Sequence, residues 1–174
     1  QKEQTISLCR DRMGEKPLYY GWHDNKFMFC SELKGIYAAY SPKNFEIDFE
    51  ALSSYFKYGY ISAPKTIFTN FKKLAPGQIL TLGEGQIIKQ GFNLDQAMLS
   101  TKPYWSLEGA VEESSSIIIT NPDFAANKLD NLLNEIICEQ SISDVPLGSF
   151  LSGGIDSSIV TAILQANSAQ PIKS

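Results

Sequence analysis

A short apolar run, a turn with two adjacent glycines and a helix-forming segment follow one another between residues 147 and 165. The apolar run 147–151 predicts a buried strand, and residues 157–165 have the spacing of a helix. A strand that passes through a tight turn into a helix is the opening unit of an α/β domain. This order of elements constrains the last third of the chain to that fold class.

The turn, with the sequence SGGIDSS over residues 152–158, has the composition of an anion-binding loop. Adjacent glycines let the backbone approach a ligand without a Cβ atom in between, and the following helix offers unpaired N–H groups and the positive end of its dipole. Serine hydroxyls add further donors. The predicted phosphate-binding residues are Leu151, Ser152, Gly153, Gly154, Asp156, Ser157 and Ser158.

Asp156 at the rim of this loop would repel a bare phosphate, so it implies a Mg²⁺ ion between its carboxylate and a nucleotide. The alternative is that Ser-Gly-Gly is an ordinary turn and Asp156 a helix cap. On spacing alone these two interpretations stay equally open. The sequence contains neither a P-loop string nor a GxGxxG fingerprint.

Charge and hydropathy exclude two classes of partner. The net charge is -4, and no basic block is longer than Lys72-Lys73, so nucleic acid is not an expected partner. Apolar runs such as 117–119 are far shorter than the ~20 residues that cross a bilayer, so no membrane span is expected. Three widely separated cysteines predict reduced thiols in a cytoplasmic protein: Cys9, Cys30 and Cys138.

The first hundred residues predict antiparallel sheet with flanking helices. Strands are expected at residues 5–9, 17–20, 26–29, 77–82 and 86–90, and helices at 32–40 and 49–58. Gly83-Glu84-Gly85 is expected to be the hairpin turn between the last two strands. From residue 106 to 120 the periodicity fails, which predicts a weakly structured connection. Asn121 and Pro122 then begin an amphipathic helix that runs to about Gln140.

Several of these segments resemble known families. The loop resembles the SGGxDSS pyrophosphatase loop of the N-type ATP pyrophosphatases, and residues 144–151 before it resemble one branch of them, glutamine-hydrolysing asparagine synthetase. Other segments resemble the glutaminase domain of that family: RDRMGEKPLYY at 10–20, FCSELK at 29–34, KLAPGQ at 73–78 and PYW at 103–105. Together the resemblance spans nearly the whole chain in the family's order.

The resemblance implies an α+β fold, with the C-terminal part of an N-terminal-nucleophile glutaminase sandwich joined to the start of an α/β ATP-pyrophosphatase domain. The expected boundaries are 1–107 for the glutaminase part, 108–121 for a linker and 122–174 for the synthetase part. It also implies an ATP-dependent ligase with Mg²⁺, which activates aspartate as an acyl-adenylate and amidates it with ammonia from glutamine. Glutamine, aspartate and ATP are the implied partners, and a homodimer is left open.

No catalytic residue is assigned. The glutaminase nucleophile of the family is the N-terminal cysteine of the mature chain, whereas Cys9 is predicted in mid-strand without a free α-amino group. We therefore expect an internal piece that spans a domain junction and is inactive alone. A related amidotransferase or β-lactam-forming synthetase acting on another carboxylic acid, and a non-catalytic module, stay open as alternatives.

Three further groups of residues are predicted to be structural. The charge cluster of Arg10, Asp11, Arg12 and Lys16 is expected to order a strand-to-turn segment. His23 is expected to be a solvated turn residue, because it has no metal-ligand partner at suitable spacing. Three tyrosines are expected to pack at a domain edge: Tyr55, Tyr58 and Tyr60.

Overall fold

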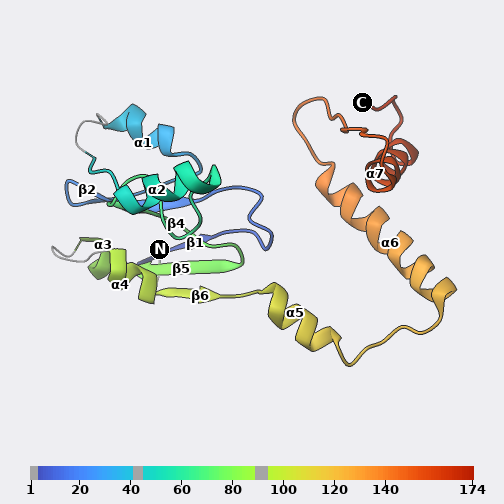
Figure 1. Ribbon diagram of the computed structural model, residues 1–174, viewed down its shortest axis with the longest axis horizontal. Helices are drawn as coiled ribbons and strands as arrows, with labels where there is room; N and C mark the ends of the chain where they lie inside the picture. Colours follow the sequence, from blue (N-terminus) through green and yellow to red (C-terminus); the bar gives the residue numbers. More distant parts are fainter. Residues whose placement is uncertain (1–3, 41–44, 89–93) are drawn as a thin grey trace. The chain divides into compact units, whose positions relative to one another are not determined.

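A computed structural model describes residues 4–40, 45–88 and 94–174 of the chain. The chain forms two compact units, Gln1–Glu113 and Ser114–Ser174 (Figure 1). The fold is α+β with antiparallel sheets, as the sequence predicts.

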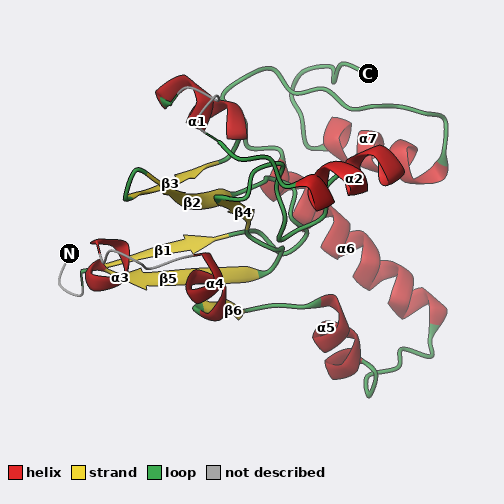
Figure 2. Cartoon of the chain, turned by 60° about the vertical axis from the view of Figure 1, so that its left-hand side comes forward, coloured by secondary structure: helices red, strands yellow, loops and turns green. Residues whose placement is uncertain are grey.

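The first unit contains two three-stranded antiparallel sheets, which Figure 2 shows as two layers. The first sheet has the order β1 (Thr5–Cys9), β5 (Gln78–Gly83), β6 (Thr101–Pro103). The second sheet has the order β3 (Lys26–Cys30), β2 (Tyr19–His23), β4 (Phe71–Lys73). In the first sheet Leu8 pairs with Leu80, so the two leucines point to the same face.

Apolar side chains from both sheets form the main core of this unit. Its buried members are Leu8, Tyr20, Leu74, Leu80, Leu82 and Ala97. A second buried cluster, which includes Phe71 of β4, is mostly aromatic and consists of Ile36, Phe45, Phe68 and Phe71. The alternation along β5, with Leu80 and Leu82 buried and Thr81 exposed, is the period of two that a sheet with one buried face requires.

Five helices of the first unit lie within the described residues: α1 (Leu33–Ala39), α2 (Phe49–Tyr58), α3 (Glu84–Ile88), α4 (Leu94–Leu99) and α5 (Leu107–Ser114). The helix predicted over 49–58 is confirmed. Asp48 caps it by accepting a hydrogen bond from the Ala51 amide at 2.9 Å, and Gly59 ends it at φ 79°.

Two predictions for the first unit are wrong. The strand expected at 86–90 is instead helix α3 as far as Ile88, and residues 89 and 90 lie outside the described residues. The Gln86 side chain accepts a hydrogen bond from the Gly83 amide at 2.8 Å, which favours helix over a hairpin turn. The connection expected to be weakly structured contains α5, because the Ser106 hydroxyl caps this helix at the Gly109 amide, 3.0 Å away.

The structural role predicted for Arg10 is confirmed. Its buried guanidinium donates to the carbonyls of Lys16 at 2.9 Å, Leu74 at 2.7 Å and Gly14 at 2.8 Å. The neighbouring Asp11 carboxylate accepts the amides of Glu15 and Lys16, and these backbone bonds lower the pKa of Asp11. The turn between residues 10 and 16 is therefore held by two groups: the Arg10 guanidinium donates to its carbonyls, and the Asp11 carboxylate accepts from its amides.

His23 and the three tyrosines differ from their predicted environments. His23 ends β2 and is buried, with its ring edge-on to Tyr40 and Phe45, so its expected solvation is wrong. The turn is made by Asp24 and Asn25 alone, both at positive φ. The tyrosines, predicted to be packed, are more than half exposed: Tyr55, Tyr58 and Tyr60.

The second unit contains two helices, α6 (Pro122–Gln140) and α7 (Ile155–Ala166). Asn121 caps α6 as predicted, accepting from the Phe124 amide at 2.9 Å. The strand predicted over 147–151 is wrong: this segment makes a single parallel bridge, from Gly148 to Lys173, and the Phe150 side chain is fully exposed. A strand needs a neighbouring ladder, and one bridge among the described residues does not supply it.

Candidate functional site

The loop predicted to bind phosphate turns directly into helix α7. Gly153 adopts φ +82°, a left-handed conformation that side chains with a Cβ atom rarely take. Gly154 follows in extended conformation as the N-cap residue, and Ile155 begins the helix. The sequence therefore places its two glycines where the chain reverses and where the helix begins.

The beginning of α7 has unsatisfied donors and open space in front of it. Its N-cap residue makes no side-chain cap, and the first bond of the helix runs from the Ser158 amide to the Gly154 carbonyl at 3.1 Å. The amides of Ile155, Asp156 and Ser157 precede that bond, so they have no acceptor inside the helix. A Cβ atom added at Gly153 would meet nothing within 4 Å. An anion could therefore approach these amides closely.

The serines of the loop bond to one another and to the loop backbone. Ser152 Oγ lies 3.0 Å from Ser157 Oγ, and the hydroxyls of Ser157 and Ser158 donate to the Gly154 carbonyl at 3.1 and 2.7 Å. These bonds hold the hydroxyls beside the open N-terminus of α7. Each hydroxyl would have to rotate to donate to a phosphate oxygen.

Asp156 lies in the first turn of α7 and is exposed. Within the described ranges, no hydrogen bond or ion pair involves its carboxylate. The same ranges contain no group of three or more His, Cys, Asp or Glu residues placed to hold a metal ion. Magnesium bound to a nucleotide often uses one or two carboxylates and takes its other ligands from phosphates and water, so a single free carboxylate fits this kind of site.

Contacts that the sequence does not reveal connect the segment before the loop to α7 and to the end of the chain. The Ser149 amide donates to the Lys173 carbonyl at 2.8 Å, beside the parallel bridge at Gly148. Ser149 Oγ lies 2.9 Å from Thr161 Oγ1, and the Thr161 hydroxyl donates to the Ser157 carbonyl at 2.8 Å. The segment and the return of the chain thus run parallel to one another on either side of α7 in sequence, joined by a single bridge and without forming strands.

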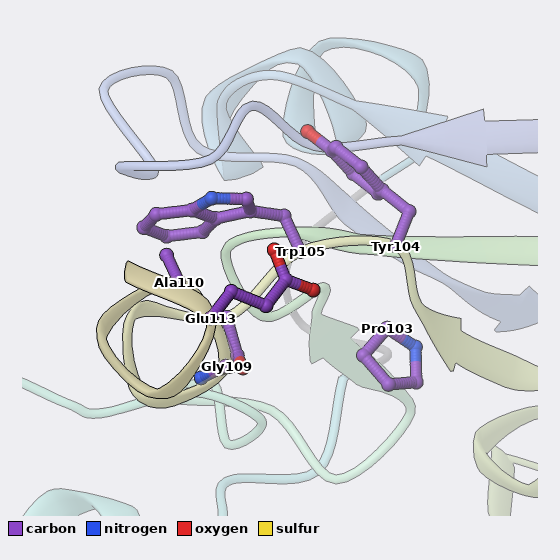
Figure 3. Close-up of a pocket in the computed structure, with 7 residues that line it drawn as sticks. Pro103, Tyr104, Trp105, Gly109, Ala110 and Glu113 are labelled. Carbon is purple, nitrogen blue, oxygen red and sulfur yellow. Dashed lines mark hydrogen bonds between the residues drawn. The ribbon is translucent and has the colours of Figure 1, made fainter. Parts of the chain in front are cut away.

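The first unit has a hollow of its own, of about 340 Å³, between residues 103–106 and α5. Figure 3 shows the Glu113 carboxylate beside Trp105, and the Tyr104 side chain directed away from α5. The Tyr104 phenol donates to the Arg10 carbonyl at 2.9 Å instead of facing a ligand. None of the predicted phosphate-binding residues lines this hollow, so we do not assign the nucleotide to it.

Residues 1–93 match the family of the glutamine amidotransferase domain, which covers more than half of the chain. The chain therefore belongs to the glutamine amidotransferase domain family. Its residues 128–174, which include the loop and α7, match the asparagine synthase family. The family resemblance described from the sequence motifs is confirmed, with the two matched segments in the predicted order.

Individual relatives agree with these matches. The chain is 35% identical over 170 residues to a protein of Methanocaldococcus jannaschii named putative glutamine-hydrolyzing asparagine synthetase 2, covering 95% of the chain and 29% of that protein. It is 34% identical to glutamine-hydrolyzing asparagine synthetase 3 of Bacillus subtilis, covering 94% and 24%. It is 31% identical to asparagine synthetase 1 of the same organism, covering 94% and 23%. The chain thus spans less than a third of the length of these relatives.

Among the helices of the described segments, none combines the length and the apolar character that a membrane crossing requires.

Proposed function

We propose that this chain contributes the nucleotide-binding loop of an ATP-dependent, glutamine-hydrolysing asparagine synthetase. The observation that carries the proposal is the open N-terminus of α7 behind Gly153 and Gly154, inside the segment that matches the asparagine synthase family. Its relatives bear the name asparagine synthetase, which supports aspartate as the acid to be amidated and glutamine as the source of ammonia.

In this proposal the loop binds the phosphates of ATP. The amides of Ile155, Asp156 and Ser157 donate to phosphate oxygens at the positive end of the α7 dipole. The other residues of the proposed site supply close backbone approach or hydroxyl donors: Leu151, Ser152, Gly153, Gly154 and Ser158. Asp156 would hold a Mg²⁺ ion, which supplies positive charge to the phosphates while the aspartate carboxylate is converted to an acyl-adenylate.

Cys9 has no catalytic part in this proposal. It lies within β1, paired with Ile79, so its amide nitrogen belongs to a peptide bond and cannot act as the base of a nucleophilic cysteine. We expect the 174-residue chain to release no glutamate from glutamine. Glutamate release that disappears in Cys9→Ala would contradict this assignment.

The proposal has three further parts: the domain boundaries predicted from the sequence, a cytoplasmic location and the absence of a nucleic-acid partner. The three cysteines are free thiols, which suits a reducing compartment.

Binding of Mg²⁺-ATP and Mg²⁺-pyrophosphate to the 174-residue chain tests the loop directly, with ³¹P NMR as the readout. We expect Gly154→Val to weaken binding at least about tenfold, because the added branch stands where a phosphate would approach the backbone. Asp156→Asn should reduce the Mg²⁺ dependence of binding and keep the size of the side chain. Gly85→Val, in α3, is the control: a Cβ atom at Gly85 would meet nothing within 4 Å, and one at Gly154 would make only an ordinary contact with Ser152 Oγ at 3.6 Å.

The chemistry is tested in a polypeptide with the length of the relatives. There, both loop variants should abolish aspartate-dependent exchange between ATP and pyrophosphate and leave glutamate release in place. If a well-folded Gly154→Val protein bound Mg²⁺-ATP like the unaltered chain, the loop would be a structural turn. A second outcome separates the loop from the acceptor acid. If Gly154→Val lost Mg²⁺-ATP binding, but exchange in the unaltered longer polypeptide required a carboxylic acid other than aspartate, the loop assignment would hold and the proposed acceptor would be wrong.

A further inference from the structure

Two pairs of hydroxyl groups cross the phosphate loop, residues 152–158, at different levels. The inner pair lies within the loop, where Ser152 Oγ is 3.0 Å from Ser157 Oγ. The outer pair, called the hydroxyl clamp, consists of Ser149 and Thr161, with 2.9 Å between Ser149 Oγ and Thr161 Oγ1. Ser149 precedes the loop, and Thr161 lies in the second turn of α7. The clamp therefore joins the two segments that enter and leave the loop.

The hydrogen bonds of the clamp run in one direction. The Thr161 hydroxyl donates to the Ser157 carbonyl at 2.8 Å. A hydroxyl has a single proton to donate, so Ser149 is the donor in its bond to Thr161 Oγ1. Both clamp side chains are partly buried, which limits competition from water. The Ser149 amide also donates to the Lys173 carbonyl at 2.8 Å, so the clamp connects the entering segment, α7 and the returning chain.

The inner pair cannot hold the loop while phosphate is bound. The hydroxyls of Ser152 and Ser157 have to rotate away from their present partners before they can donate to phosphate oxygens. The clamp lies three residues before Ser152 and four residues after Ser157, and neither clamp residue is among the proposed phosphate-binding residues. Its bonds can therefore persist in the bound state. Binding groups have to be held within about 0.5 Å of their productive geometry by supporting hydrogen bonds, and the clamp is placed to do this.

We propose that Ser149 and Thr161 are positioning residues, which hold the phosphate loop in the geometry that binds the phosphates of ATP. This inference rests on the nucleotide-binding function proposed above. The clamp holds the Ser157 carbonyl, and with it the first turn of α7 and its open amides, in place relative to the segment before the loop. Coupling between two events is reciprocal, so a ligand that binds more tightly when the clamp is closed also keeps the clamp closed.

The affinity for Mg²⁺-pyrophosphate, measured on the 174-residue chain by ³¹P NMR, tests the clamp. Thr161→Val keeps the shape of the side chain and removes the hydroxyl, so it should raise the dissociation constant about three- to tenfold, the value of one net hydrogen bond. Thr161→Ser restores the hydroxyl and should bind like the unaltered chain. Ser149→Ala should weaken binding as much as Thr161→Val, and the double variant no further. Ser168→Ala is the matched control, because the Ser168 hydroxyl donates to the Gln170 carbonyl beyond the other end of α7.

Hydrogen exchange of the Ser149 amide distinguishes positioning from a general stabilisation of the fold. This amide is protected by its bond to the Lys173 carbonyl, beside the clamp. Saturating Mg²⁺-pyrophosphate should slow its exchange in the unaltered chain by the same factor of about three to ten. In Thr161→Val the ligand should leave the exchange rate unchanged, because the clamp that couples the two events is missing. Equal slowing in both chains would contradict coupling through the clamp.

The outcomes separate the clamp from the loop itself. Mg²⁺-pyrophosphate binding that is unchanged in Thr161→Val, or weakened equally in Thr161→Ser, would overturn the positioning role and leave the loop assignment standing. An unaltered chain that bound no Mg²⁺-pyrophosphate would contradict the proposed function and this inference together. Circular dichroism verifies the fold of each variant. If Thr161→Val did not fold, Ser149→Ala, which leaves the sequence of α7 intact, would decide by the same criteria.

Discussion

The Tyr104 phenol donates a hydrogen bond of 2.9 Å to the Arg10 carbonyl across 94 residues of sequence. The guanidinium of the same Arg10 reaches the Leu74 carbonyl, 64 residues away. The ends of β1, β4 and β6 are thus tied together at one residue. Arg10 thus connects the two sheets of the first unit by polar contacts, in addition to their shared apolar core.

Arg10→Lys is expected to destabilise the first unit by about 2 kcal/mol or more, although it keeps the positive charge. An ammonium group cannot reproduce the planar fork that serves three carbonyls, and a buried carbonyl left without a donor, as at Leu74, costs about 1–3 kcal/mol. Both tryptophans, Trp22 and Trp105, lie in this unit, so their fluorescence in a urea titration reports its unfolding. Arg12→Lys, at an exposed residue, is the control and should unfold like the unaltered chain.

Tyr104→Phe is expected to cost about 1 kcal/mol, the usual net contribution of one hydrogen bond, because the ring stays in place and only the donor is lost. The same urea titration measures it. Tyr60→Phe, which removes an exposed hydroxyl, should have no measurable effect. Equal midpoints for the two variants would mean that the Arg10 carbonyl is satisfied by water.

Gly77→Ala is expected to destabilise the first unit strongly, whereas Gly85→Ala should not. Gly77 adopts φ +66°, and a Cβ atom there would collide with the Trp105 carbonyl oxygen. Gly85 lies in helix α3 with nothing within 4 Å of an added Cβ atom, so alanine should be neutral or stabilising by up to about 1 kcal/mol. Thermal unfolding of both variants compares the two sites. If Gly77→Ala left the unfolding temperature unchanged, the contact between residue 77 and the Trp105 carbonyl oxygen would be able to widen without a loss of stability.

The first unit should lose stability between about pH 10 and pH 12. Burial raises the pKa of Tyr20 to about 12, against about 10 in an unfolded chain. The unfolded state therefore loses its proton first, so the contribution is complete below pH 10 and disappears as the pH rises through 12. The expected loss is on the order of 2 kcal/mol, since one pKa unit equals about 1.4 kcal/mol. Tyr20→Phe should flatten this part of the stability curve, and Tyr60→Phe should leave it unchanged.

Local patterns predicted most of the elements of the first unit. The strands at 5–9 and 77–82 and the helix at 49–58 were predictable because alternation, caps and turn residues agree there. The helix after Gly83 was not predictable. The Gln86 side chain accepts a hydrogen bond from the Gly83 amide at the end of β5, and this contact depends on the geometry of the strand end. His23 was misassigned because its burial depends on Tyr40 and Phe45, which follow it by many residues.

The candidate loop was predictable as a glycine turn entering a helix, but not in its details. Its sequence indicated the positions of Gly153 and Gly154 and the helix that begins at Ile155. The apolar run before it predicted a strand, and only the parallel bridge at Gly148 is present. Apolar composition specifies what a segment can bury, whereas a strand also needs a neighbour, and that information is not local.

The hydrogen bonds of Arg10 also determine the order in which the first unit can be completed during protein synthesis. Its partners at Gly14 and Lys16 leave the ribosome within moments of Arg10, but Leu74 and Tyr104 follow only after most of the unit has been translated. Within the part of the chain that the structure describes, β1 pairs with β5, which emerges much later. Contacts between residues so far apart in sequence form late and slowly. A nascent chain stalled before Tyr104 should therefore bind chaperones more strongly than one stalled after Glu113.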